Sequence, residues 1–101
     1  MRSSDLTLAA LSSQELIRRC GPYDHVNVRP RAGHLIIDVI DPDGDSSTVA
    51  RATPLGGTAH GLSFQTSGGR WEPMPVSGSL EEIAAGVVGL LGPYLDPANL
   101  R

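Results

Sequence analysis

The chain has 101 residues, a length that suits one domain, residues 1–101, with a single hydrophobic core. Its formal net charge is -3 and its sequence pI is about 5.4, which argues against a general polyanion binder. Every Lys or Arg position holds arginine, so Schiff-base and P-loop lysines are excluded. Cys20 is the only cysteine, which excludes an intramolecular disulfide.

The sequence has none of the patterns of a secreted or membrane-spanning protein. Its first residues lack the apolar stretch of a signal peptide, and the longest uncharged run, residues 83–95, is too short for a membrane span. We therefore expect a cytoplasmic protein with no membrane partner. Residues 1–4 and 97–101 are expected to be frayed.

Two helical segments are predicted near the N-terminus. Asp5 can cap a short helical turn that ends at Leu11. A capping box formed by Ser12 and Glu15 then predicts the start of a separate helix. This second helix should end at Cys20, because a Gly-Pro pair follows it.

The middle of the chain has the two-residue apolar period of β-strands. Strands are predicted at residues 25–29, 34–40, 48–53, 62–66 and 70–74. The second strand is apolar on both faces, which favours a position inside the sheet. Pro73 and Pro75 have no amide hydrogen to donate, so the last strand should lie at an edge or end early.

The connections between the predicted strands are too short for parallel crossovers. Residues 30–33, Asp41–Gly44 and Ser67–Gly69 have the composition of turns, whereas residues 54–59 predict a looser loop. We therefore expect an α+β fold, with an N-terminal helix, a four- to five-stranded antiparallel meander sheet, and a C-terminal helix packed on one face.

The last predicted helix begins with a capping box at Ser79 and Glu82, closes at a Gly-Pro pair, and has its apolar run through Leu95. With about 100° per residue, one broad side of the helix is apolar and should cover the sheet. This side comprises Leu80, Ile83, Ala84, Val87, Leu90, Leu91 and Tyr94.

No metal-binding pattern is complete in the sequence. Asp41, Asp43 and Asp45 alternate as calcium ligands do, but Gly44 stands at the wrong loop position and no glutamate closes the loop. A hairpin turn explains these residues better. The histidines at positions 25, 34 and 60 lack zinc-ligand spacing, and we expect them at the surface or at strand ends.

Catalytic and cofactor signatures are missing as well. Ser63 lacks the second glycine of a nucleophile elbow, and Cys20 lies near a helix C-terminus, whose dipole disfavours a thiolate. No glycine-rich nucleotide-binding pattern occurs. The sequence therefore predicts a non-enzyme with no cofactor and no metal.

Two groups of residues are candidates for an interaction site. The first is a helix surface of small residues, Ala85, Gly86 and Gly89, opposite the apolar side of the last helix. A second copy of the chain or another protein can come close to such a surface. The second group is the arginine cluster Arg18, Arg19, Arg29 and Arg31, which suits an acidic protein. A nucleic acid is the other possible ligand of this cluster, but four arginines that do not alternate with aromatic residues would give only weak phosphate contacts.

The function expected from these features is a small non-enzymatic protein-interaction module of the adaptor, chaperone, inhibitor or immunity type. We expect it to form a homodimer through a sheet edge or the small-residue helix surface. One alternative is a nucleic-acid-associated accessory protein that uses the arginine cluster. Another is a small-ligand-binding domain or enzyme, with a pocket between sheet and helices lined by His60 and Trp71.

Overall fold

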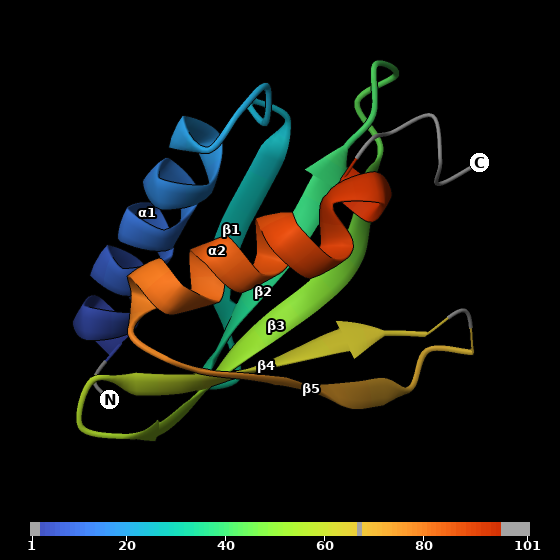
Figure 1. Cartoon of the computed structure of the whole chain (residues 1–101). Helices are drawn as coiled ribbons and strands as arrows, with labels where there is room; N and C mark the ends of the chain where they lie inside the picture. The colour runs from blue at the N-terminus through green and yellow to red at the C-terminus, as the bar shows by residue number, and fades with distance from the viewer. Residues whose placement is uncertain (1–2, 67, 96–101) are drawn as a thin grey trace.

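The computed structural model describes residues 3–66 and 68–95. The chain has the predicted α+β fold, an N-terminal helix, a five-stranded antiparallel meander and a C-terminal helix (Figure 1). The elements are α1 (Ser3–Arg19), β1 (Val26–Arg31), β2 (His34–Ile40), β3 (Ser46–Gly56), β4 (Ala59–Gln65), β5 (Trp71–Gly78), α2 (Leu80–Leu91) and the 3-10 helix η1 (Gly92–Leu95). Residues 3 and 4 are helical, although we expected them to be frayed. The same expectation for residues 97–101 concerns positions outside the described part of the chain.

The helix α1 is continuous over 17 residues, so the prediction of two separate segments was wrong. Ser12 lies inside the helix and caps nothing, and the neighbouring Ser13 Oγ donates to the Ala9 carbonyl oxygen at 2.7 Å. This i−4 bond satisfies a serine within a helix. The buried residues Leu6 and Ile17 lie on either side of these serines. Packing of one long apolar stripe therefore outweighs the local capping signal.

The five strands follow one another across the sheet in the order β1-β2-β3-β4-β5. The strand β2 lies inside the sheet and β5 lies at an edge, as its prolines predicted. Between β1 and β2 the chain turns at Ala32 and Gly33, both of which have positive φ angles. The predicted turn at Asp41–Gly44 is present, with the Gly44 amide donating to the Asp41 carbonyl oxygen at 2.9 Å. The predicted Ser67–Gly69 connection includes residue 67, which is outside the described residues.

The predicted loose loop at residues 54–59 was wrong. The strand β3 continues to Gly56 and β4 begins at Ala59, so the two strands extend into a tight turn. Gly56 and Gly57 have φ angles of 125° and 55°, which glycine adopts without strain. Because the chain can reverse within this turn, Pro54 still pairs with His60 in the sheet.

Both helices pack against the same face of the sheet, and the sheet lies behind them in Figure 1. The core lies between these two layers. It includes Ile17 of α1, Val28 of β1, Leu35, Ile37 and Val39 of β2, Leu62 of β4, and Ile83, Val87 and Leu91 of α2. No helix in the described residues is both long and apolar enough to cross a membrane.

The helix α2 begins at the predicted capping box, where Ser79 Oγ accepts from the Glu82 amide at 3.2 Å. Its apolar side is buried as expected at Ile83, Ala84, Val87 and Leu91, but Leu90 is 49% exposed. The α-helix ends at Leu91 with Gly92 as its C-cap, as the Gly-Pro pair predicted, and the chain then tightens into η1. Gly92 has right-handed backbone angles, so it does not turn the chain away. The side chain of Tyr94 is outside the described part.

Candidate interaction surface

Within residues 3–66 and 68–95, no helix covers the second face of the sheet (Figure 1). We call this the outer face. Its side chains follow from strand alternation and from the cross-strand register. The outer face comprises Asn27, Arg29 and Arg31 of β1, His34, Ile36, Asp38 and Ile40 of β2, Ser46, Thr48, Arg51, Thr53 and Leu55 of β3, Gly61, Ser63 and Gln65 of β4, and Trp71, Pro73 and Ser77 of β5.

A buried carboxylate ties three strands together on the outer face. Asp38 of β2 is 4% exposed, and it accepts from Arg29 Nε at 2.6 Å and from Thr48 Oγ1 at 2.7 Å. The arginine occupies Oδ2 and the hydroxyl occupies Oδ1. Because a buried carboxylate without partners is strongly unfavourable, these two bonds offset the cost of burying the Asp38 side chain in the sheet. The side chain of Arg29 is thereby engaged within the chain.

Arg51 and Trp71 form the second feature of the outer face. The Arg51 Cζ atom lies 4.5 Å from the centroid of the Trp71 ring. Arg51 is on β3 and Trp71 is on β5, so the arginine reaches across β4, where its register partner is the small Ser63. Arg51 Nε is buried and has no hydrogen-bond partner in the described residues. The guanidinium is therefore held by stacking on the ring.

The outer face has an excess of positive charge, although the whole chain is acidic. Arg29, Arg31 and Arg51 belong to this set, and Asp38 is the one acidic residue in it. Since Asp38 pairs with Arg29, the charges of Arg31 and Arg51 are left without an acidic neighbour in the set. Such a surface attracts negatively charged groups.

The edge of the sheet at β1 is covered by side chains of α1. Gln14 Oε1 accepts from the Val28 amide at 3.0 Å, and Arg18 Nε donates to the Val26 carbonyl oxygen at 3.0 Å. Pro30 lies two residues after Val28, so its backbone nitrogen faces the same edge, and it has no amide hydrogen. These contacts occupy backbone groups that a further strand needs for pairing.

The opposite edge of the sheet, at β5, is protected from strand pairing by its own sequence and not by contacts with another element. In β5, Pro73 and Pro75 remove two amide donors from the edge strand. Both edges of the sheet are therefore poor templates for strand addition. The geometry gives no support to the expectation that the chain self-associates through a sheet edge.

The four arginines predicted as one cluster fall into two groups. Arg18 and Arg19 lie on α1, where Arg18 binds the β1 backbone and Arg19 pairs with Glu15 at 3.2 Å. Arg29 and Arg31 lie on the outer face. The sheet adds Arg51 and Trp71 to the second group, so an aromatic ring accompanies these arginines after all.

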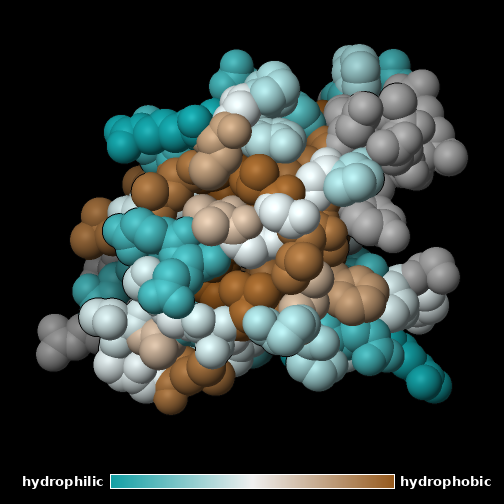
Figure 2. Space-filling view, viewed as in Figure 1, coloured by the Kyte–Doolittle hydropathy of each residue, from teal (hydrophilic) through white to brown (hydrophobic). Residues whose placement is uncertain are grey.

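The predicted small-residue surface of α2 is smaller than expected. Ala85 and Gly89 are exposed, and a Cβ at Gly89 would meet no other atom within 4 Å. Gly86 differs, because a Cβ there would lie 2.6 Å from Val76 Cγ1 of β5. The absent side chain of Gly86 lets α2 approach the sheet, so this residue is not part of the outward surface. Apolar residues gather over and beside α2 on this side of the molecule (Figure 2).

The predicted pocket between sheet and helices does not join His60 to Trp71. His60 is 2% exposed and lies on the helix-covered face, in line with Leu62, whereas Trp71 lies on the outer face. A surface position was therefore the wrong expectation for His60, whereas the alternative, a strand end, is met because His60 is the second residue of β4. Its Nδ1 lies 3.3 Å from the Thr58 carbonyl oxygen, and its Nε2 is buried without a hydrogen-bond partner in the described part.

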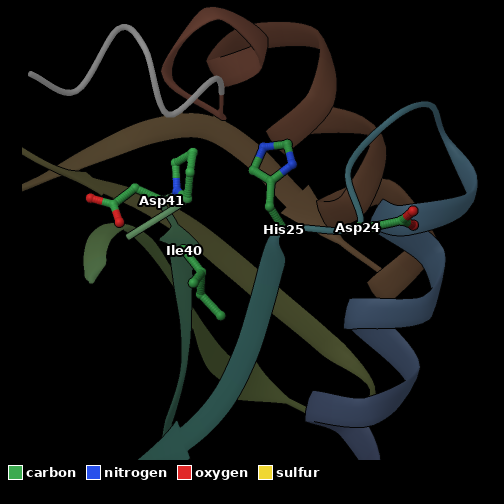
Figure 3. A pocket seen from close by; sticks show the side chains of 5 residues that line it. Asp24, His25, Ile40 and Asp41 are labelled. Atoms are coloured by element: carbon green, nitrogen blue, oxygen red, sulfur yellow. The ribbon is translucent and has the colours of Figure 1, made fainter. Parts of the chain in front are cut away.

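A shallow pocket lies where β1 starts and β2 ends, as shown in Figure 3. It is lined by Asp24, His25, Ile40, Asp41 and Pro42. The two carboxylates point away from each other, and His25 Nε2 contacts the Leu95 carbonyl oxygen. Among the described residues, no group of three or more His, Cys, Asp or Glu side chains is arranged to hold a metal ion. The pocket therefore does not bring together a catalytic set.

Sequence reasoning missed Ile36 and Arg51, and it assigned Trp71 to a pocket with His60 instead of to the outer face. Each lies in a predicted strand, so strand alternation carries part of the signal for its orientation. Their proximity depends on the register, which shifts at a bulge in the pairing of β2 with β3 and again between β4 and β5. No protein-family model, curated protein or solved structure matches the chain.

Proposed function

We propose that the chain is a non-enzymatic protein-interaction module that binds another protein through the outer face of its sheet. The observation that carries the proposal is the Arg51–Trp71 stack on a sheet face without a helix. Tryptophan and arginine are enriched among residues that dominate binding energy at protein interfaces. The exposed Cys20 suits a reducing compartment such as the cytoplasm.

The blocked edges support a face-to-face contact over strand addition. Gln14 and Arg18 already bind the β1 backbone, and two prolines interrupt β5. The charge of the outer face also favours a different protein over a second copy, because a symmetric dimer brings identical patches together. Two outer faces in contact would oppose their unpaired arginines. Any self-association is therefore expected at the outward surface of α2.

A nucleic-acid-associated accessory protein is the second candidate function. The observation in its favour is Trp71, since a base can stack on an aromatic ring beside a cation. Against it, the outer face offers few cations for phosphate contacts, and Arg29 is engaged by Asp38. A protein partner needs fewer such contacts, so we favour it.

A photo-cross-linking experiment tests the proposed function. We would replace Gln65 on the outer face with benzoylphenylalanine and make the matched variant at Ser12, which is exposed on α1. Irradiation in cells of the source organism is expected to give a protein adduct from position 65 and none from position 12. The adduct should disappear when Arg51→Ala is added. Cross-linking from position 12 alone, or equally from both positions, would contradict an interface on the outer face.

A further inference from the structure

We propose that the partner presents an acidic segment to the outer face and that Arg51 binds one of its carboxylates. This inference rests on the proposed function and names the chemistry of the partner. It follows from the position of one guanidinium on the sheet and from the charges around it.

Arg51 differs from the arginines that have partners within the chain. Arg18 donates to a backbone carbonyl, Arg19 pairs with Glu15, and Arg29 pairs with Asp38. Arg51 is partly buried, and its Nε is fully covered without an acceptor in the described residues. Because Nε is covered, an incoming carboxylate can meet only the terminal guanidinium nitrogens of Arg51. A partly desolvated cation interacts more strongly with an anion than a fully solvated one does.

Trp71 sets the orientation of the Arg51 guanidinium. With Cζ 4.5 Å from the ring centroid, the planar group rests on the indole and cannot swing freely. A guanidinium held in this way loses less entropy when it binds a carboxylate through two hydrogen bonds. Arginine suits this geometry better than lysine, which carries only a point charge.

The surroundings of Arg51 fit a polypeptide segment. The register places Ile36 on one side of Arg51 and Ser63 on the other, along a row that runs across β2, β3 and β4. Ile36 is only 7% exposed and is already covered by its neighbours, whereas Ser63 is partly exposed and provides a small hydroxyl. A segment that lies across the strands can therefore place an acidic side chain at Arg51 and a polar group at Ser63.

The charge distribution favours carboxylates over a phosphate backbone. Among the outer-face arginines, only Arg31 and Arg51 have no acidic partner in the described part of the chain, and they offer few contacts to a polyanion. The turn between β2 and β3 carries Asp41, Asp43 and Asp45 at one end of the same sheet. A long nucleic acid would be repelled by this end, whereas a short acidic segment need not reach it.

The test is a titration of the isotope-labelled full chain, followed by NMR. The probes are a capped peptide of alternating glutamate and alanine, the same peptide with glutamine for glutamate, and an oligothymidylate of equal charge. The glutamate peptide is expected to shift the amides of Ile36, Arg51, Ser63 and Trp71, with a Kd that rises with salt. The glutamine peptide should cause no comparable shift.

Variants assign the effect to Arg51. Arg51→Ala is expected to weaken binding of the glutamate peptide about 10-fold or more, because it removes charge-assisted hydrogen bonds. Arg51→Lys should recover only part of this loss. Arg19→Ala removes an equal charge from the exposed end of α1 and should leave the Kd unchanged.

Three results would overturn the inference: no binding of the glutamate peptide, equal binding of the glutamine peptide, or tighter binding of oligothymidylate on the same residues. Cross-linking from position 65 together with any of these would leave the outer face as a protein interface and refute only its carboxylate chemistry. If position 65 gives no adduct and the glutamate peptide does not bind, both proposals fail.

Discussion

Arg51 of β3 lies over the indole of Trp71 of β5, with 4.5 Å between Cζ and the ring centroid, although β4 separates the two strands. The contact is possible because the intervening residue, Ser63, is small and faces the same side. It joins the middle of the sheet to its proline-containing edge.

Replacement of Trp71 by alanine should destabilise the chain by about 1 kcal/mol or more, because the cation–π contact and the buried ring surface are both lost. Trp71→Phe should keep part of the stack and lose less stability. Urea unfolding followed by circular dichroism measures both effects, since the variants lack the only tryptophan. Equal stability of Trp71→Ala and the parent chain would show that the stack contributes nothing.

Replacement of Asp38 by alanine should cost about 2 kcal/mol, because Arg29 and Thr48 lose their buried acceptor. The loss stays moderate because the Arg29 side chain is 40% exposed and can be rehydrated. The control is Glu15→Ala, which breaks the exposed pair with Arg19 and should cost about 0.5 kcal/mol or less. Similar losses for the two variants in urea unfolding would contradict a structural role for Asp38.

Two glycines of α2 should respond in opposite directions to the same substitution. Gly89→Ala places its Cβ in open space and should stabilise the helix by about 0.5 to 1 kcal/mol. Gly86→Ala places its Cβ 2.6 Å from Val76 Cγ1 and should destabilise the chain. Adding Val76→Ala should relieve the Gly86→Ala clash. Thermal unfolding of the three variants measures the difference, and a stabilising Gly86→Ala would be inconsistent with the close contact to β5.

His60→Leu should raise stability by about 1 kcal/mol, because it removes a buried nitrogen that has no hydrogen-bond partner in the described residues. The weak contact with the Thr58 carbonyl at 3.3 Å is also lost, but Thr58 is exposed and water can replace it. The control is His34→Leu, which removes the 3.0 Å contact with Thr53 and should not stabilise the chain. A less stable His60→Leu variant in urea would indicate that the histidine is satisfied in the folded chain.

Self-association through the outward surface of α2 remains a prediction from the sequence. If it occurs, the weight-average mass in sedimentation equilibrium should increase with protein concentration. Gly89→Glu should lower this mass towards that of a monomer, because it places a charge beside Ala85 and Leu90. Ser12→Glu on the exposed side of α1 should have no effect. A parent chain with the same monomer mass at all concentrations would exclude a homodimer in this range.

Much of the candidate site was hidden from sequence reasoning. Arg29 and Arg31 were proposed, but they were grouped with Arg18 and Arg19 because all four are near one another in the chain. The fold places Arg18 against the β1 edge and brings Arg51 and Trp71 to the outer face instead. Distance along the chain is a poor guide here, because antiparallel pairing brings distant residues side by side.

The sequence by itself determined the order of the elements and several of their ends. Local chemistry is sufficient for this: Ser79 and Glu82 cap α2, Asp41–Gly44 forms a turn, and the prolines of β5 suit only an edge. Each of these signals acts over a few residues of backbone, so it can be recognised before the fold is known.

Only the tertiary structure decided which residues meet. Packing on the sheet made α1 continuous across Ser12, and the side that the helices cover decided that His60 is buried while Trp71 faces outward. The register of β3 against its neighbours placed Arg51 between Ile36 and Ser63. These outcomes depend on hydrogen bonds and apolar contacts between distant segments, which no local pattern encodes.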